Sequence, residues 1–392
     1  MFGASGAVFS VSKLPCRALE AVAGRSDRHL FWAGTAVAGN ADNELVLTEF
    51  KEEFNSAKRI ASAPLPGEAW SIAAHPTKPE LVLACLGATD ASAPAARTGS
   101  ILRMSEGIFD LNPDSSHVAE LDTVGTLSMS KNTGVLRRAL WHPADEDFDT
   151  GNAHDESRLT SVSDGVVHLW DVLGSRLDNI GEAQLAEGQA NCAAWDPHHV
   201  TQVSAGAGTQ LQTVDLRSMQ VVRSIEDAHD LAVRDVDYNP NKPYYCATAG
   251  DDRRCKFWDL RKSDTPVKVI TAHAHWVCNV KYNRFHDQLV LTSGTDSLVN
   301  LYRMSSISSA PLLELEEDLG EPASANSASS SRDGNPASDS ADAVVKSIDS
   351  HAESVYGAAW SACDAWVFAT LSYEGSLAIN HVPSAEKYKI LL

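Results

Sequence analysis

Short apolar or alternating segments, separated by turn-forming residues, run through most of the chain. The clearest set lies between residues 221 and 261, and its segments are residues 221–225, 233–238, 245–249 and 256–258. Turn-forming residues at 239–243 and 250–253 separate three of them. Alternation with a period of two, interrupted by turns at this spacing, predicts four short β-strands that form one antiparallel unit.

One phrase recurs along the chain: an apolar run that ends in an aromatic residue, a polar residue and, in the best copies, proline. The best copies are Trp141-His142-Pro143, Trp195-Asp196-Pro197 and Tyr238-Asn239-Pro240. Weaker copies are Ala74-His75-Pro76, Tyr282-Asn283-Arg284 and Trp360-Ser361-Ala362. The copies end at 76, 143, 197, 240, 284 and 362, which gives spacings of 67, 54, 43, 44 and 78 residues. The shortest spacings match the roughly 40–45-residue period of a WD40 propeller blade, so the pattern predicts an all-β propeller.

Insertions explain the longer spacings. Residues 87–100 are rich in Ala, Ser and Gly, and residues 305–342 are dominated by Ser, Ala, Asp, Glu and Asn. An acidic loop at 144–157 lengthens a third spacing. Segments of this composition bury too little apolar surface to offset the entropy lost on ordering, so 87–100 and 305–342 are predicted to be disordered inserts.

The unit between residues 221 and 261 also carries the four polar side chains typical of a WD40 blade: His229, Thr248, Asp252 and Trp258. We expect the carboxylate to orient the imidazole and the indole N–H to be satisfied, which ties the loop before the innermost strand to the next turn. Weaker versions are Thr160, Asp164 and Trp170 without a histidine, His273, Thr292 and Asp296 with Tyr302, and His351, Thr370 and Glu374 with Asn380.

Counting innermost strands predicts seven blades. Six accompany the recurring phrase, and the N-terminal region, with apolar stretches at 7–19, 30–35 and 44–50, supplies the seventh. Outer strands precede six innermost strands, so a closed ring needs one more. Residues 388–392 are long enough, and we expect this tail to pair with the last blade and cover its exposed edge. The chain is therefore predicted to be a single seven-bladed propeller over residues 1–392.

Composition narrows the class of partner. The formal net charge of −20 disfavours binding to nucleic acid or to anionic membrane surfaces, which depends on Lys and Arg contacts. No apolar run approaches the roughly 18 residues of a membrane span, and no secretory signal is visible, so we expect no direct membrane insertion. The seven cysteines are scattered singly, which indicates reduced thiols in a cytosolic protein.

Candidate catalytic and metal-binding groups have simpler structural interpretations. His273, His275 and Trp276 could suggest a metal site, but His273 falls at the network position and no third ligand is near in sequence. Asp251 and Asp252 could act as paired carboxylates, but Asp252 has a network role and Asp251 is a turn residue. No nucleophile elbow and no phosphate-binding loop occur. We therefore predict no enzyme, no cofactor and no metal.

Binding residues are easier to propose. By register, side chains at the start of the innermost strands ring the upper rim of the propeller. The candidate partner-binding rim is Trp70, Arg137, Arg234, Trp276 and Tyr356, with Glu68 and Asn191 beside them. Aromatic and Arg side chains are enriched in protein interfaces, although Trp70 and Trp276 could instead pack between blades.

Two consecutive blade endings, Val214-Asp215-Leu216-Arg217 and Trp258-Asp259-Leu260-Arg261, share an x-Asp-x-Arg pattern. The pair looks like the double box by which some WD40 proteins dock to the adaptor of a cullin-RING ubiquitin ligase. Arg217 and Arg261 would then present two guanidinium groups on one face. Local pairing of each Arg is the alternative.

Several short segments carry a resemblance to a known family: Arg234-Asp235, 239–242, 250–252, 286–292, 306–309, 378–383 and 389–392. In these segments the chain resembles the EARP- and GARP-interacting WD40 family of endosomal trafficking proteins. It covers most of the chain from Trp195 onward and is thinner before that, although 67–70 and 161–171 also fit.

This resemblance implies a scaffold that binds multisubunit tethers at endosomes and the trans-Golgi network, in cargo recycling and retrograde traffic. It implies a cytoplasmic protein held at these membranes by its partners, and we expect a monomer within larger complexes. A substrate receptor of a cullin-RING ligase is the second hypothesis. A catalytic propeller would need convergent acids or metal ligands that the sequence does not show.

Overall fold

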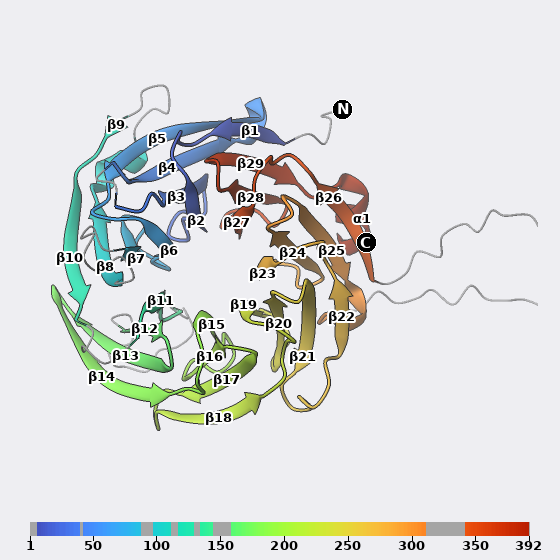
Figure 1. Cartoon of the computed structure of the whole chain (residues 1–392). Coiled ribbons are helices and arrows are strands. Elements are labelled where there is room, and N and C mark those ends of the chain that lie inside the picture. Colours follow the sequence, from blue (N-terminus) through green and yellow to red (C-terminus); the bar gives the residue numbers. More distant parts are fainter. Residues whose placement is uncertain are drawn as a thin grey trace, which may run out of the picture.

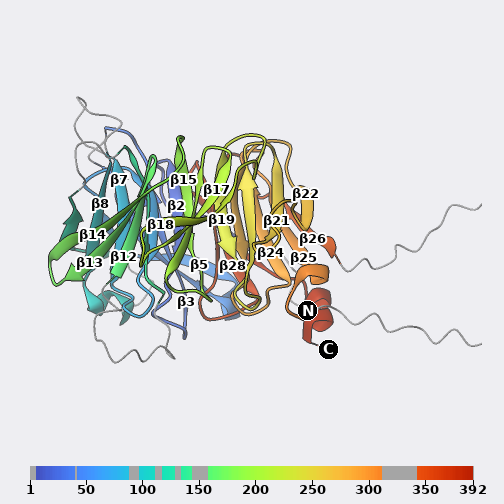
Figure 2. The same cartoon turned by 90° about the horizontal axis from the view of Figure 1, so that it is seen from below.

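The computed structural model describes residues 6–39, 42–87, 97–110, 117–128, 134–143, 158–310 and 342–391. These residues form seven antiparallel sheets, the blades, arranged radially about one axis (Figure 1). Seen from the side, the blades make a disc whose strands run between two faces (Figure 2). The predicted seven-bladed β-propeller is confirmed. We call the side on which the innermost strands begin upper and the side on which they end lower.

Blades 1 to 7 follow chain order, and each contributes four strands from the axis outward. The innermost strands are β2 (Cys16–Ala21), β6 (Ala69–Ala74), β11 (Leu136–Trp141), β15 (Ala190–Trp195), β19 (Val233–Tyr238), β23 (Val277–Tyr282) and β27 (Val355–Trp360). The second strands are β3 (His29–Thr35), β7 (Leu81–Gly87), β12 (Arg158–Ser163), β16 (Gln202–Ala207), β20 (Tyr245–Gly250), β24 (Leu289–Gly294) and β28 (Val367–Ser372).

The third strands are β4 (Glu44–Lys51), β8 (Arg97–Met104), β13 (Val166–Leu173), β17 (Gln210–Asp215), β21 (Arg254–Asp259), β25 (Val299–Met304) and β29 (Ser376–His381). The outermost strands are β5 (Ser56–Pro64), β10 (Leu121–Leu127), β14 (Arg176–Gln184), β18 (Gln220–Ile225), β22 (Lys268–Thr271), β26 (Asp342–Ile348) and β1 (Ala7–Ser10). A short strand β9 (His117–Val118) adds in parallel to β5. The described helices are η1 (Glu52–Phe54), η2 (Glu106–Asp110), η4 (Ser305–Ile307) and α1 (Ser384–Leu391).

The core is divided into seven apolar clusters, each between two consecutive blades. One of them joins the last blade to the first: Phe31 and Val46 of blade 1 pack with Leu371 and Ile379 of blade 7. A cluster at every junction, including this one, means that the ring is closed and that every sheet buries both faces.

The recurring phrase has a structural role at the lower ends of the innermost strands. Its aromatic residue bonds to the preceding blade in two copies: Trp141 Nε1 donates to the Ala73 carbonyl and Trp360 Nε1 to the Lys281 carbonyl, both at 3.1 Å. Its polar residue caps the turn that follows, as Asn239 Oδ1 does by accepting bonds from two backbone N–H groups. The repeat therefore marks ties between blades and tight turns.

The ring is closed by the N-terminal strand, so the prediction for residues 388–392 is wrong. β1 pairs with β29 through Ala7 and Ile379, which completes blade 7 with strands from both ends of the chain. Residues 388–391 belong to helix α1, and residue 392 lies outside the described residues. Ala, Glu and Lys after Pro383 favour helix over strand. The predicted N-terminal segment 7–19 is in fact two strands in two different blades.

The two expected inserts lie largely outside the described residues, at 88–96 and 311–341, as does the loop at 144–157. Their described ends are ordered. Residues 97–100 belong to β8, residues 305–307 form η4 and Asp342 begins β26. The predicted inserts therefore extend too far at these ends.

Candidate functional site

The four-residue network of blade 5 joins the loop before β19 to the turn after β20. His229 Nδ1 lies 2.9 Å from Asp252 Oδ1, and Thr248 Oγ1 lies 2.8 Å from His229 Nε2. The indole N–H of Trp258 donates to the same hydroxyl at 2.9 Å. Burial alone would raise the pKa of Asp252, but the hydrogen bond and charge of His229 hold it at about 2. These four side chains therefore support the scaffold.

The same arrangement in blade 6 accounts for the histidines considered as metal ligands. His273 Nδ1 lies 2.9 Å from Asp296 and its Nε2 2.8 Å from Thr292, so both ring nitrogens are occupied. His275 contacts Thr295 through Nδ1. These contacts are those of a blade network, and they give His273 no nitrogen for a metal.

Blades 3 and 7 carry incomplete networks. In blade 3, Trp170 Nε1 donates to Ser161 Oγ at 2.9 Å and not to Thr160. In blade 7, His351 Nε2 lies 2.8 Å from Thr370 Oγ1, but among the described residues its Nδ1 has no hydrogen-bond partner. Glu374 accepts from Ser372 Oγ instead, at 3.3 Å.

Every innermost strand has a β-bulge at its second residue, where the register with the second strand shifts. The seven bulged residues are Arg17, Trp70, Arg137, Asn191, Arg234, Cys278 and Tyr356. A bulge leaves one residue unpaired and turns its side chain away from the normal alternation. We call this ring of side chains, with Arg97 above it, the upper rim.

The structure places four of the five predicted rim residues at these bulges. Trp276 instead precedes β23, whose bulged residue is Cys278, and its side chain is exposed. Arg17 was not predicted, because residues 7–19 were predicted as one stretch and its strand, β2, was not distinguished from β1 before it. The missed signal is that Cys16-Arg17-Ala18 starts an innermost strand as Val233-Arg234-Asp235 does.

Arginine and aromatic side chains stack on the upper rim. The Arg17 guanidinium lies 4.2 Å from the ring centroid of Trp70 and 4.7 Å from that of Tyr356. The Arg97 guanidinium also contacts Trp70 and lies 3.4 Å from the same ring centroid. Arg234 lies 5.1 Å from the centroid of Trp276. These distances are those of cation–π contacts, which fix the arginine planes.

Two rim arginines are neutralised by aspartates at the turns between second and third strands. Arg137 makes two bonds to Asp164, at 2.8 and 2.9 Å. Arg234 makes two bonds to Asp251, at 2.5 and 2.7 Å. Asp251 and Asp252 therefore bind separate partners, Arg234 and His229, and the interpretation as a paired-carboxylate catalytic site is not supported.

A cavity of about 460 Å³ opens at the lower end of the axis. The tryptophans of the recurring phrase line it together with charged side chains, including Trp141, Trp195, Trp360, Glu20, Arg138 and Lys281. Lys281 and Arg138 pair with Asp235, which is 1% exposed, at 2.7 and 3.4 Å.

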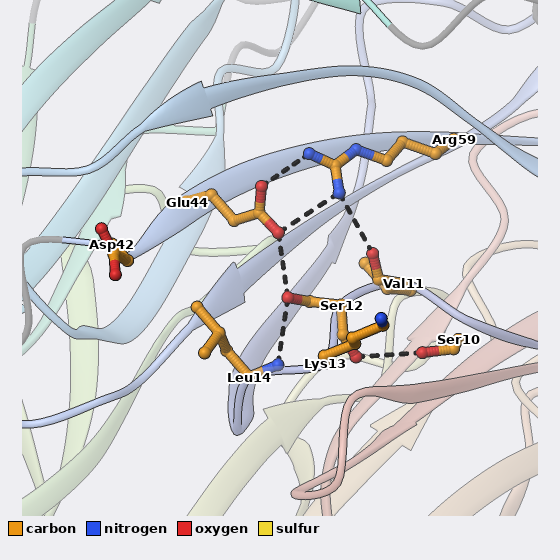
Figure 3. A pocket seen from close by; sticks show the side chains of 8 residues that line it. All are labelled: Ser10, Val11, Ser12, Lys13, Leu14, Asp42, Glu44 and Arg59. Atoms are coloured by element: carbon orange, nitrogen blue, oxygen red, sulfur yellow. Dashed lines mark hydrogen bonds and ion pairs between the residues drawn. The ribbon is translucent and has the colours of Figure 1, made fainter.

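The seam between blades 7 and 1 has a pocket of about 590 Å³ on its upper side (Figure 3). Glu44 in this pocket bonds to Arg59 at 2.6 Å and accepts from Ser12 Oγ at 2.9 Å. Glu44 is thus paired within the pocket, whereas Arg59 Nε has no hydrogen-bond partner among the described residues.

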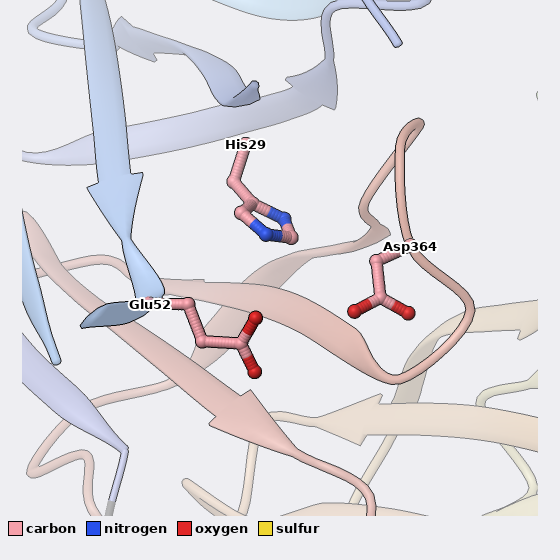
Figure 4. Close-up of side chains that lie close together, drawn as sticks. All are labelled: His29, Glu52 and Asp364. Atoms are coloured by element: carbon pink, nitrogen blue, oxygen red, sulfur yellow. The ribbon is translucent and has the colours of Figure 1, made fainter. Parts of the chain in front are cut away.

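A second cluster lies on the lower side of the seam, where His29 faces Glu52 and Asp364 (Figure 4). One ligand atom from each lies within 4.8 Å of the others, a spacing compatible with a metal ion. However, the Glu52 side chain is 55% exposed and also lies 3.8 Å from His381. Surface ion pairing explains the group, and we assign no metal to it.

Arg217 and Arg261 follow the third strands of blades 4 and 5, so both lie on the lower side. Arg217 is 78% exposed and lies 3.6 Å from Asp215. Arg261 is 56% exposed and makes two bonds to Asp259, at 2.9 and 2.7 Å. Both guanidinium groups are therefore accessible, and each has a local carboxylate.

Among the described helices, none has the length and apolar character needed to cross a bilayer.

Comparison with known proteins identifies the family to which the chain is similar. The family model described as the EIPR1 beta-propeller matches residues 5–302. The human protein named EARP and GARP complex-interacting protein 1 is 36% identical over 393 residues, covering 96% of each chain.

Relatives in other animals are similar to the chain over most of its length. The zebrafish (Danio rerio) protein named EARP-interacting protein homolog is 36% identical over 96% of each chain. The Caenorhabditis elegans protein named EARP-interacting protein 1 is 30% identical over 83% of this chain and 82% of its own length. With its seven closed blades, this chain belongs to the EIPR1 β-propeller family.

Proposed function

We propose that this chain is a non-enzymatic scaffold that binds tethering complexes of the EARP and GARP type. It would act in endosomal recycling and in retrograde traffic to the trans-Golgi network. The observation that carries the proposal is the 36% identity to the human complex-interacting protein over 96% of both chains. Relatives of this identity and coverage share a fold, and several of them are named for their interaction with these complexes.

The construction of the propeller supports a binding role. The histidines and aspartates that could suggest chemistry in blades 5 and 6 are tied into blade networks. The upper rim instead presents arginine and aromatic side chains, which are the usual anchors of protein interfaces. A rigid ring can hold such anchors in fixed positions while tether subunits assemble around it.

The proposal also includes the place of action. The protein would be cytoplasmic and peripheral to endosomes and the trans-Golgi network, held there by its partners. A net charge of −20 opposes direct attachment to anionic lipid. We propose a monomer that enters larger complexes, with no nucleic-acid partner.

Affinity capture of the tagged full-length protein tests the proposal. Mass spectrometry of the captured material should find the subunits of an EARP- or GARP-type tether together, above the level captured by an unrelated propeller with the same tag. If the protein has a normal unfolding transition and captures none of these subunits, the proposal is overturned.

A second candidate function is a substrate receptor of a cullin-RING ligase. The observation in its favour is that Arg217 and Arg261 occupy equivalent, exposed positions in adjacent blades. The local pairing with Asp215 and Asp259 weakens it, because each fork already has an acceptor. Changing both arginines to alanine should abolish adaptor binding without altering the urea midpoint, and a wild-type protein that binds no adaptor would end this candidate.

A further inference from the structure

Two of the four rim arginines have no ion-pair partner in the described part of the chain. Arg137 and Arg234 each bond twice to an aspartate. Arg17 contacts only the rings of Trp70 and Tyr356 there, and Arg97 contacts Trp70 and, at 3.5 Å, the Leu136 carbonyl. The upper rim is therefore divided into a compensated half and an uncompensated half.

The aromatic contacts of Arg17 favour binding through its N–H edge. Its guanidinium carbon lies over the rings of Trp70 and Tyr356, 4.2 and 4.7 Å from their centroids. The N–H donors of a guanidinium lie in its plane, so a stacked arginine binds at its edge. A planar carboxylate can accept two parallel N–H bonds from such an edge. Because the stacking already fixes the side chain, less conformational entropy is lost when the ligand binds.

Among the described residues, the charges of Arg17 and Arg97 also lack a paired carboxylate. Burial lowers the pKa of Arg17, and the nearby charge of Arg234 lowers it further. Burial together with the charges of Arg137 and Arg17 lowers the pKa of Arg97 to about 10. Glu68 opposes these effects, but it makes no ion pair with either arginine. An incoming negative group would relieve the repulsion among these guanidinium groups.

We propose that the upper rim binds an acidic side chain of a partner polypeptide, with Arg17 forking its carboxylate and Arg97 as a second donor beside Trp70. A polyanion such as nucleic acid would be repelled by a chain of net charge −20. Glu68 keeps the rim only mildly positive, which suits one carboxylate better than a dianionic phosphate. The inference rests on the proposed function and deepens it by naming the chemistry of one contact with the tether.

Capture experiments with full-length variants test the contact. Arg17→Glu should reduce recovery of tether subunits at least about tenfold, the equivalent of losing one charge-assisted bond. Arg217→Glu, the same change of charge at an exposed arginine on the lower side, is the control. It should recover the tether as the wild type does. Equal recovery by Arg17→Glu and the wild type would overturn the rim contact and leave the proposed function standing.

Arg17→Lys guards against a folding artefact. It keeps the charge but not the fork, so recovery should fall between that of the wild type and that of Arg17→Glu. If Arg17→Glu shifts the urea midpoint, the comparison of wild type with Arg17→Lys decides instead. The wild type must itself capture the tether for this comparison. If Arg17→Lys then recovers as much tether as the wild type does, forked recognition is contradicted.

A peptide selection tests the rim without the tether. A random peptide library displayed on phage is selected on the wild-type protein after removal of binders to Arg17→Glu. Enriched peptides should share an Asp or Glu, and changing that residue to its amide should weaken binding at least about tenfold. Absence of a shared acidic residue would overturn the proposal, whatever the capture experiment shows. A synthetic phosphoserine version that binds more tightly than the Glu version would show that the rim is a phosphate site and that the carboxylate assignment is wrong.

Discussion

Blades 5 and 7 follow the same four-strand plan but are held together differently. Blade 5 comes from one continuous segment, from β19 to β22, and its network joins His229, Thr248, Asp252 and Trp258. Blade 7 takes β27 to β29 from the C-terminal end and β1 from the N-terminal end. Its His351 bonds to Thr370 alone.

The difference shows that the ring combines two kinds of stabilisation. Blade 5 satisfies its buried polar groups locally, within about 30 residues of chain, as a repeat unit does. Blade 7 lacks that local network and depends on contacts between segments far apart in sequence. Because closing a long loop costs entropy, we expect blade 7 to be the point at which the ring opens first.

Removing β1 should have the largest effect. A variant that starts at Val11 loses the ladder to β29 and the contacts of Ala7 and Phe9 with the seam core. The free energy of unfolding should fall by at least about 3 kcal/mol, and the exposed strand edge should promote aggregation. Urea denaturation followed by tryptophan fluorescence measures this.

A variant lacking residues 388–392 is the matched control. It removes only the end of helix α1, so its loss should be clearly smaller. A larger loss than that of the variant starting at Val11 would mean that the C-terminal tail, and not β1, closes the ring.

Thr248→Val and Thr370→Val compare the two networks directly. In blade 5 the change leaves both His229 Nε2 and the Trp258 indole N–H without their partner, at about 1–3 kcal/mol for each buried group. In blade 7 the Thr370 hydroxyl bonds to His351 and, at 3.4 Å, to the Ala378 carbonyl, but to no indole among the described residues. Thr248 makes the equivalent bond to the Lys256 carbonyl at 3.5 Å, so the loss of this bond is common to both variants. Thermal or urea unfolding should therefore show about twice the loss for Thr248→Val. Equal losses would show that the indole contributes nothing measurable.

Local structure could be predicted from the sequence. Fixed spacing among His229, Thr248, Asp252 and Trp258 follows from one hairpin and its flanking loop, so it can be read from one segment. Six of the seven blades also follow from the repeat, because each phrase marks one innermost strand, and the seventh follows from the N-terminal apolar stretches. Four rim residues followed from strand register alone.

Prediction from the sequence failed where distant segments compete for one position in the fold. Residues 388–392 and Ala7–Ser10 are both short apolar stretches that could have covered the edge of β29, and periodicity cannot distinguish a strand from a helix over so few residues. Trp276 was predicted at the rim in place of Cys278 because short-range periodicity does not fix where a strand begins. β23 begins at Val277, so Trp276 precedes the strand and the bulged second residue is Cys278.

The two blades should respond to acid in different pH ranges. Burial lowers the pKa of His351 from 6.5 to about 4, against the opposing charge of Glu374. The unfolded chain then binds the proton more tightly, so the stabilisation is complete above pH 6.5 and is lost as the pH falls toward 4. In blade 5, Asp252 has a pKa of about 2 instead of 3.8, and its contribution is lost only between these values.

The His351→Gln variant isolates the effect of blade 7. Between pH 7 and pH 5 the wild type should lose about 2 kcal/mol more stability than this variant does. His75 has a pKa of about 4 as well, but its contribution is common to both proteins and cancels in the difference. Parallel stability curves for the two proteins over this range would contradict the assignment to His351.

Glu386→Gln should have the smallest effect of the four. Glu386 in helix α1 lies 2.5 Å from Arg303 in β25 of blade 6, a side chain that is 1% exposed. Glutamine can still accept one hydrogen bond but removes the charge, so we expect a loss of about 1 kcal/mol in urea unfolding. Glu353→Gln, at an exposed position of blade 7, should cost nothing measurable. If the two variants were equally stable, α1 would add nothing to the packing of blade 7 on blade 6, and blade 7 would depend on β1 and its apolar core alone, in contrast to the local network of blade 5.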